Sequence, residues 1–388
     1  MPSPLTAGNR KPTMTTITER PVDHALAILR KRAEVGLNPF FSVSAAEESV
    51  AAIDQLRSPA SDEWAGAFLH LASDWATRAR EAGPGSEGAA SAWMMAYDYA
   101  HIARYPCIDT ALKGDAYDRS VEYFRRAHAD RDDIEFVAVT SALGPLPCVL
   151  ALPEGAGPFP LLVAVGGLDV WKEELVTVVV GPYIAAGFAV LAVDAPGTGQ
   201  SPVRMTPAAD AMWDAILDWA GTRPDLTGFR SILGTSLGGY WAARAGHTHA
   251  QRFHAAINHG GPAHYSFQAE WLDRWVDRGE YPCAFTRALA TVMGSADEHE
   301  FTASLPALSL LDTKIIDSPS APMILVNGVH DRTISPEDMY LLARHGRPKS
   351  IRLYEAGHMG FTPTTVPTIV DWLVDVNCRN RHAADVSS

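Results

Sequence analysis

Residues 231–239 read Ser-Ile-Leu-Gly-Thr-Ser-Leu-Gly-Gly, a short apolar run followed by the pattern Gly-x-Ser-x-Gly. The apolar run suits a buried strand, and the residues after the pattern suit the start of a helix. So sharp a turn from strand to helix strains the backbone of the central serine, which is why small residues flank it. The stretch therefore predicts that the Ser236 hydroxyl projects from one edge of a sheet. For the pentapeptide alone, a glycine-rich turn with an incidental serine is the alternative.

Two further reactive side chains follow apolar runs nearer the C-terminus. Asp331 comes a few residues after the run 324–326, and His358 comes after the run 352–354. A serine hydroxyl is a weak nucleophile at neutral pH, so it needs an imidazole base that a carboxylate orients. The chain order serine, aspartate, histidine is that of the α/β-hydrolase fold. We therefore predict a catalytic triad of Ser236, Asp331 and His358, with a loop aspartate or a helix cap as the alternative for Asp331.

A serine nucleophile of this kind also needs two backbone N–H groups, which bind the oxyanion that forms when a carbonyl is attacked. One comes from the residue after the nucleophile, Leu237, and the other from the loop after the third strand. That loop reads Gly166-Gly167-Leu168-Asp169, and we predict the Leu168 N–H as the second donor because it follows the glycine pair. A simple turn at the two glycines is compatible with this role.

The order of the apolar patterns indicates two structural units in the 388 residues. Residues 1–21 are polar and are expected to form a flexible tail, whereas residues 22–130 show helical spacing and predict an all-helical lid domain. Over residues 131–388, β-rich runs alternate with amphipathic helices, which predicts an α/β fold with a mostly parallel central sheet and helices on both faces. A helical insertion is expected at about 263–318, after strand six. The expected strands are 134–140, 146–152, 160–165, 188–193, 230–233, 255–258, 323–326 and 350–354.

The composition argues against several classes of partner. The formal net charge is −13, so the surface repels nucleic acid and anionic lipid, and no local basic patch offsets this charge. The four cysteines are scattered without metal-ligand spacing, which indicates reduced thiols and no bound metal. No apolar leader and no run of about eighteen apolar residues occurs, so we expect a cytoplasmic protein without a membrane span.

The chain resembles the 2,6-dihydroxypseudooxynicotine hydrolase group of α/β-hydrolases, which is related to the FrsA-like esterases and to fungal enzymes that shorten polyketides. The shared stretches are residues 166–174, 234–239, 260–261 and 328–331. This resemblance implies an N-terminal helical domain on a hydrolase core, and a homodimer. It also implies an enzyme without metal or organic cofactor that cleaves a carbon–carbon bond next to a carbonyl, in a β-diketone or an acylated electron-rich ring.

By this resemblance, Ser236 attacks the ketone of a hydrophobic, polyketide-like small molecule, and water activated by His358 completes the reaction. The family's extra acidic residue soon after the glycine pair 260–261 has two candidates here, Glu270 and His264. Hydrolysis of an ester or thioester, or acyl transfer, with the same triad is the alternative chemistry. A non-catalytic binding protein on the same fold is the third interpretation, but such a protein has no need of a strained serine.

Two further stretches have both a functional and a structural interpretation. Residues 172–174, Lys-Glu-Glu, either orient the oxyanion loop through a charge pair or form a solvated helix start. Trp93, Tyr97, His101 and Tyr105 lie at near-helical spacing. They either line a substrate pocket or form the contact of the helical domain with the core.

Overall fold

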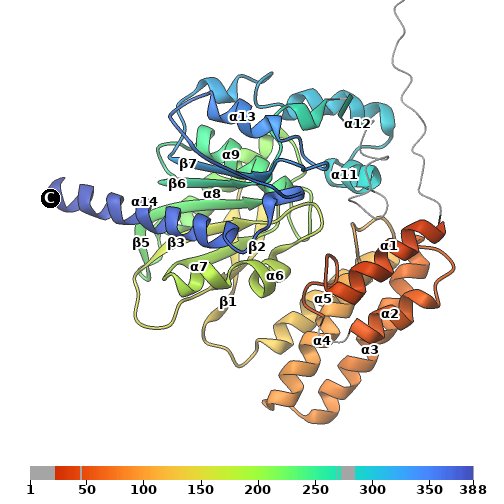
Figure 1. Ribbon diagram of the computed structural model, residues 1–388. Helices are drawn as coiled ribbons and strands as arrows, with labels where there is room; N and C mark the ends of the chain where they lie inside the picture. Colours follow the sequence, from red (N-terminus) through yellow and green to blue (C-terminus); the bar gives the residue numbers. More distant parts are fainter. Residues whose placement is uncertain (1–21, 44–45, 269, 272–284, 388) are drawn as a thin grey trace, which may run out of the picture.

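The first part of the described chain is helical. The computed structural model describes residues 22–43, 46–268, 270–271 and 285–387, and the expected tail at 1–21 lies outside them. Side-chain caps define two of the helix starts, because Ser86 Oγ accepts the Ala89 N–H and Thr110 Oγ1 accepts the Lys113 N–H. The helices are α1 (Val22–Val35), α2 (Ala46–Asp54), α3 (Ser61–Ala82), α4 (Glu87–Ala103) and α5 (Ala111–Ala127) (Figure 1).

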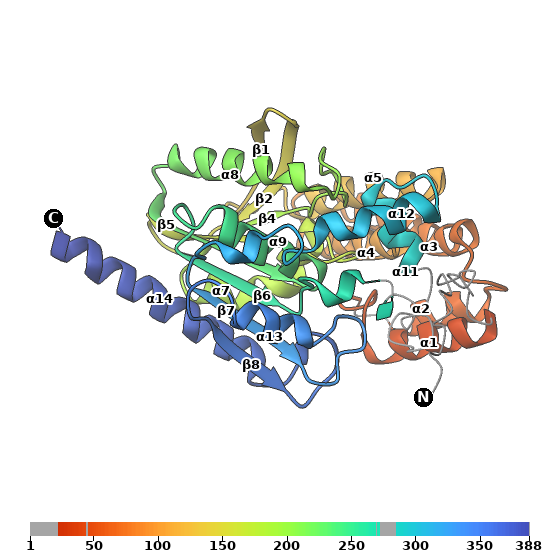
Figure 2. The ribbon, with the colours of Figure 1, turned by 90° about the horizontal axis from the view of Figure 1, so that it is seen from above.

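These helices pack onto the rest of the molecule through one continuous apolar cluster. Trp64 and Phe68 on α3 lie ring to ring at 4.5 Å, and Trp64 Nε1 donates to the Ile102 carbonyl on α4 at 2.8 Å. The same cluster of buried side chains continues into the sheet at Leu162 and Val190. Figures 1 and 2 show the helices to one side of the sheet. Burial of this shared apolar surface holds the two parts together.

The second part is built around one eight-stranded sheet. Its strands are β1 (Ile134–Ser141), β2 (Gly144–Ala151), β3 (Phe159–Val165), β4 (Ala189–Val193), β5 (Leu226–Thr235), β6 (Ala255–His259), β7 (Met323–Gly328) and β8 (Ser350–Tyr354). Their order across the sheet is β1-β2-β4-β3-β5-β6-β7-β8. β1 pairs antiparallel with β2 and β2 with β4, while the other neighbours pair in parallel. Each strand expected from the sequence is present, and the prediction of a mostly parallel sheet is confirmed.

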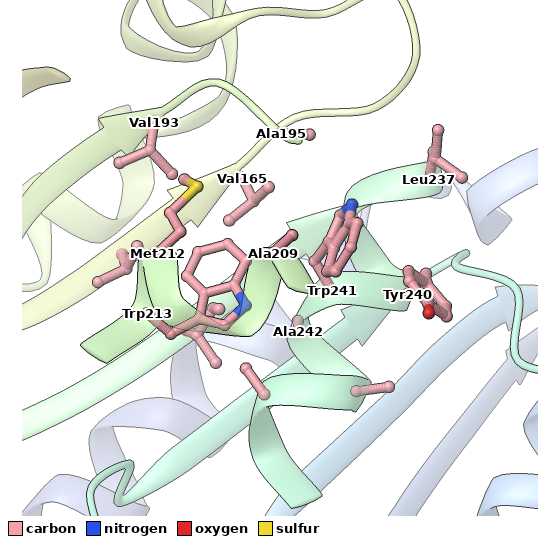
Figure 3. Packing of buried hydrophobic residues seen from close by; sticks show 14 of the residues in the cluster. Val165, Val193, Ala195, Ala209, Met212, Trp213, Leu237, Tyr240, Trp241 and Ala242 are labelled. Carbon is pink, nitrogen blue, oxygen red and sulfur yellow. The ribbon is translucent and has the colours of Figure 1, made fainter. Parts of the chain in front are cut away.

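Each face of the sheet has its own core, because successive strand side chains point to opposite faces. On one face Val163 and its neighbours pack against α8 (Ala211–Gly221) and α9 (Leu237–Thr248). Figure 3 shows part of this core, where the indole rings of Trp213 on α8 and Trp241 on α9 lie 6.3 Å apart. The opposite face packs against α7 (Gly181–Ala185), α14 (Thr365–Ser387) and the N-terminal helices. Helices therefore cover both faces.

The parallel strands bring several loops to one edge of the sheet. β3, β5, β6, β7 and β8 run in the same direction, so the loops after their carboxyl ends lie along that edge. Between β6 and β7 the chain forms α11 (Phe285–Met293) and α12 (Glu298–Ser304), within the expected insertion at 263–318. Residues 269 and 272–284 of that insertion lie outside the described residues. None of the described helices is both long and apolar enough to span a bilayer.

Candidate active site

Ser236 lies at the sharp turn between β5 and α9. Its backbone has φ 51° and ψ −127°, a conformation that strains any residue other than glycine. The turn is packed so tightly that a Cβ at Gly234 would lie 1.9 Å from the Gly238 carbonyl oxygen. The Ser236 N–H donates to the His259 carbonyl at 2.8 Å, which ties the turn to β6. The Ser236 backbone is therefore held in its strained conformation by close packing and by a neighbouring strand.

The three predicted triad side chains meet at this edge of the sheet. His358 Nε2 lies 2.9 Å from Ser236 Oγ, and His358 Nδ1 lies 2.8 Å from Asp331 Oδ2. Asp331 Oδ1 accepts the N–H groups of Thr333 and Ile334, at 2.8 and 2.9 Å. The Asp331 carboxylate is fully buried, whereas the imidazole is 26% exposed. This geometry allows His358 to take the Ser236 proton at Nε2 while its Nδ1–H donates to the carboxylate.

Two buried polar side chains that the sequence analysis did not identify hold the loop carrying His358. Asn327 Oδ1 accepts the Met359 N–H at 3.0 Å, and His259 Nε2 donates to the Met359 carbonyl at 2.8 Å. These bonds keep Met359 in a left-handed conformation with φ 64°. Burial lowers the pKa of His259 to about 4, so its ring is neutral near pH 7. In the sequence, Asn327 and His259 each appear only as a polar residue at the end of an apolar run. Their spacing along the chain does not indicate a contact with the loop that carries His358.

The two predicted oxyanion donors both lie beside the nucleophile. Leu237 is the first residue of α9, so its N–H has no acceptor within the helix. Leu168 belongs to the loop after β3, which lies against the nucleophile turn. A Cβ at Gly167 would be 3.0 Å from the Ser236 Cβ and 3.4 Å from its Oγ. Leu168, Leu237 and Ser236 line the same pocket.

This pocket is predominantly apolar. Its lining combines the loop after β3, the nucleophile turn, the segment after β6, helix α11 and the loop after Asp331. The lining residues are Leu168, Ser236, Leu237, Pro262, Ser266, Phe267, Leu289, Thr333 and Ile334. Its apolar lining suits a hydrophobic group placed beside Ser236.

The two candidates for an additional acid are not among the residues that line this pocket. Glu270 is exposed to solvent. The His264 ring is engaged elsewhere, because its Nδ1 hydrogen-bonds with Ser309 Oγ at 2.8 Å and lies 3.6 Å from Asp312. The structure therefore brings the triad and the oxyanion residues together, but it does not bring Glu270 or His264 to the Ser236 pocket.

The Lys-Glu-Glu stretch after the oxyanion loop is buried, so its interpretation as a solvated helix start is wrong. Lys172, Glu173 and Glu174 are 2, 1 and 2% exposed. Lys172 Nζ lies 2.7 Å from Glu173 Oε1 and 2.9 Å from Asp194 Oδ2. Glu174 Oε2 lies 2.8 Å from His101 Nε2 on α4, and burial raises the pKa of Glu174 to about 8. These contacts join the loop after β3 to the N-terminal helices.

The aromatic residues Trp93, Tyr97 and His101 of α4, with Tyr105 just after it, are buried and do not line the pocket at Ser236. Tyr97 packs against Phe124 of α5, with ring centroids 5.1 Å apart. His101 meets the Trp171 ring edge to face at 6.4 Å. Of the two interpretations of these residues, the structure therefore supports a contact between the helical part and the core.

Comparison with known proteins places the chain in a family. The family model described as Esterase FrsA-like matches residues 45–374. The chain belongs to the FrsA-like esterase family. A curated relative of this FrsA-like protein is the α/β hydrolase ucsC of Acremonium sp, 29% identical over 54% of this chain and 49% of the relative. The 2,6-dihydropseudooxynicotine hydrolase of Paenarthrobacter nicotinovorans is 26% identical over 60% of this chain and 62% of its own length. Esterase FrsA of Photobacterium profundum is 25% identical over 74% and 70%.

The FrsA-like chain thus spans 49% of the length of ucsC and 62% of the length of the 2,6-dihydropseudooxynicotine hydrolase. A solved structure of the 2,6-dihydroxy-pseudo-oxynicotine hydrolase superposes with a TM-score of 0.71 at 21% identity, over 91% of this chain and 95% of the other. Wild-type AbyA5 gives a TM-score of 0.70 at 20% identity, over 93% and 97%. These likenesses confirm the α/β-hydrolase fold predicted from the sequence. The sequence relatives named above are described as hydrolases or as an esterase.

Proposed function

We propose that this FrsA-like protein is a serine hydrolase that cleaves a carbonyl-activated carbon–carbon bond in a small hydrophobic molecule, such as a β-diketone or an acyl-aromatic compound. One observation carries the proposal: hydrogen bonds run from Asp331 through His358 to Ser236, whose side chain faces an apolar pocket. An imidazole held between a buried carboxylate and a serine hydroxyl makes that serine a nucleophile. A non-catalytic binding protein would gain nothing from the strained Ser236 backbone.

In the proposed reaction, Ser236 Oγ attacks the substrate carbonyl carbon while His358 Nε2 takes the hydroxyl proton. The carbonyl oxygen becomes an oxyanion, which the N–H groups of Leu168 and Leu237 bind. When this intermediate collapses, the carbon–carbon bond breaks and its electron pair leaves with the enolate, which receives the proton from His358. A water molecule, deprotonated by His358, then attacks the acyl ester on Ser236 and releases a carboxylic acid.

The choice of a carbon–carbon bond rests on similarity. The sequence relatives include the 2,6-dihydropseudooxynicotine hydrolase and the fungal hydrolase ucsC. The stretches that carry the resemblance, residues 166–174, 234–239 and 328–331, contain the predicted oxyanion residues and the predicted nucleophile with its carboxylate.

Hydrolysis of an ester or thioester, or transfer of its acyl group, is the second candidate. Among the described residues, no carboxylate lines the Ser236 pocket, and His264 does not line it either. Glu270 is likewise absent from the lining. His358 is therefore the group that can protonate the leaving group. An alkoxide or a thiolate accepts a proton from an imidazolium without further help. One sequence relative is named an esterase.

The proposal also includes three wider features of the protein. The sequence pattern predicts a helical lid domain at residues 22–130 and a hydrolase core at 131–388, and the resemblance implies a homodimer. The third feature is a cytoplasmic location. Cys107 and Cys148 are buried free thiols, in keeping with a reducing compartment. Light scattering on the purified full chain tests the homodimer, and the mass of a single chain would contradict it.

Incubation with a panel of β-diketones, acylphenols and carboxylic esters tests the chemistry, with product masses as the readout. We expect a carboxylic acid and a ketone or phenol-ring fragment from the first two classes. Rapid turnover of esters alone would assign the second candidate. In either case Ser236→Ala should abolish product formation while the protein remains folded. Product formation near the wild-type rate by Ser236→Ala would refute both.

A further inference from the structure

The oxyanion loop at residues 166–169 is tied to its surroundings at both of its last two residues. The Trp171 Nε1–H donates to the Leu168 carbonyl at 3.0 Å. An Arg104 Nη2–H donates to the Asp169 carbonyl, and Asn38 Nδ2 donates to the Asp169 carboxylate at 2.7 Å. Arg104 caps the end of α4 and Asn38 follows α1, so two of the three donors come from the N-terminal helical part.

The Trp171 indole is itself clamped by side chains of the helical part. The Arg104 guanidinium lies over the indole at 3.8 Å from the ring centroid. On α5, the Tyr117 ring meets the indole edge to face at 4.6 Å and 88°. Trp171 is 2% exposed and Arg104 is 1% exposed. The indole therefore has no room to turn its N–H away from Leu168.

Arg104 is in turn held by buried partners. Its Nη2 lies 3.8 Å from Glu174 Oε2, and its Nη1 donates to the Pro106 carbonyl at 3.4 Å. A planar guanidinium can stack on a ring and donate in its plane at the same time, which an ammonium group cannot do. A buried charge with these partners is costly to move, so the contact of Arg104 with the loop is rigid.

We propose that Trp171 and Arg104 are positioning residues for the oxyanion hole, so that the N-terminal helical part sets the geometry of the Leu168 N–H. The inference rests on the proposed role of Leu168 as an oxyanion donor. A backbone N–H stabilises the oxyanion effectively only if it already points to the position where the negative charge forms on the carbonyl oxygen. The bond to the Leu168 carbonyl fixes the peptide that follows Leu168, and the bond to the Asp169 carbonyl fixes the next peptide. With these two peptides held, the Leu168 backbone has little freedom to turn its N–H. The N-terminal helical part then helps to orient the Leu168 N–H, in addition to packing against the sheet.

A fluorophosphonate tests this inference without knowledge of the natural substrate. Ser236 Oγ displaces fluoride from phosphorus, the hydroxyl proton passes to His358, and the phosphoryl oxygen takes the place of the oxyanion. In Trp171→Phe the ring remains for Arg104 and Tyr117 but the N–H to Leu168 is lost. We expect the maximal inactivation rate, kinact, to fall about 10- to 100-fold, with the inhibitor constant KI close to wild type. Arg104→Lys keeps the charge but loses the planar stack, and kinact should fall in the same direction.

Trp213→Phe is the matched control. Trp213 is fully buried in the core of the other sheet face, and its Nε1 has no hydrogen-bond partner among the described residues. This variant loses the same atoms, so we expect a lowered melting temperature but wild-type kinact. A merely structural role for Trp171 would lower the labelled fraction or the melting temperature and would leave kinact of the folded fraction unchanged.

The outcomes separate the inference from the proposed function. If wild type is labelled on Ser236 and Trp171→Phe is labelled at the same kinact, the inference is wrong and the proposed function stands. If wild type is not labelled on Ser236 at all, the proposed function is wrong and the inference falls with it. Should Trp171→Phe not fold, Arg104→Lys provides the test, because Arg104 donates to the Asp169 carbonyl and stacks on Trp171, and an unchanged kinact there would overturn the inference.

Discussion

A Cβ atom at Gly238 would lie 2.4 Å from the carbonyl oxygen of Gly166, so the helix that follows Ser236 and the oxyanion loop meet backbone to backbone. Only glycine at position 238 allows this approach, because the nearest atoms belong to the main chain and cannot rotate away. The contact joins the nucleophile turn and the oxyanion loop into one rigid unit, which is what catalysis by a preorganised site requires.

Gly238→Ala is therefore expected to lower the free energy of unfolding by about 2–3 kcal/mol, the usual cost of overpacking a core. Urea denaturation of the two proteins measures this difference. Gly66→Ala is the matched control, because Gly66 lies on α3 with no atom within 4 Å of an added Cβ. That change should raise stability by up to about 1 kcal/mol, since alanine favours a helix more than glycine does. Equal stability of Gly238→Ala and wild type would contradict the close contact.

Asp331→Asn should lower kcat by about 10⁴ while the fold survives, because an amide presents a donor where the carboxylate presents an acceptor to His358. The imidazole would then carry its proton on Nε2 and could not accept the Ser236 proton. Steady-state kinetics on the substrate found by product analysis measures the loss. His330→Gln is the control, since His330 is exposed and pairs with Glu355 at 2.6 Å, and it should retain wild-type kcat. Near wild-type turnover by Asp331→Asn would remove Asp331 from the triad.

The buried His259 predicts loss of stability in mild acid. Burial lowers its folded-state pKa from 6.5 to about 4, so between these values the unfolded chain binds a proton that the folded protein does not. Stability therefore falls as pH falls from 6.5 towards 4, by about 2 kcal/mol at pH 5 from this residue, since one pKa unit corresponds to about 1.4 kcal/mol. His259→Gln keeps a donor for the Met359 carbonyl but does not titrate. We expect it to lose less stability than wild type between pH 7 and pH 5 in urea titrations, and an identical loss would contradict the buried neutral ring.

Glu270→Gln tests which group protonates the leaving group. Because Glu270 is exposed and does not line the Ser236 pocket, we expect kcat to stay at the wild-type value on both carbon–carbon and ester substrates. Parallel assays on one substrate of each class measure this. A loss confined to the carbon–carbon substrate would assign Glu270 a role in protonating the carbanion. His264→Gln is the companion variant, with the same expected result.

Much of the fold could be predicted because its signals are local. Runs such as 323–326 are apolar at every position, as a strand buried on both faces requires, and the structure forms β7 there. That Ser236, Asp331 and His358 come together was also predictable, since each follows a strand and the chain order is characteristic. Asn327 and His259 were not identified, because a single polar residue near a strand end gives no indication of which distant loop it will hold.

The Lys-Glu-Glu stretch at 172–174 shows where local reasoning fails. Acidic residues in the first turn of a helix are usually solvated, and the sequence left that interpretation open. In the structure these residues are buried because α4 and α5 of the helical part cover them, and His101 contacts Glu174 at 2.8 Å. Whether a charged stretch meets water or another domain depends on packing between segments far apart in the chain.

By itself the sequence determined the alternation of strands and helices, the sharp turn at Ser236, and the order in which serine, aspartate and histidine occur, because each follows from neighbouring residues. Only the tertiary structure decided which residues line the pocket, that Asn327 and His259 hold the His358 loop, and that Trp171 and Arg104 hold the oxyanion loop. The reason is physical: those relationships arise from side chains that meet only after the sheet and the N-terminal helices have packed together, and no periodicity along the chain encodes such a meeting.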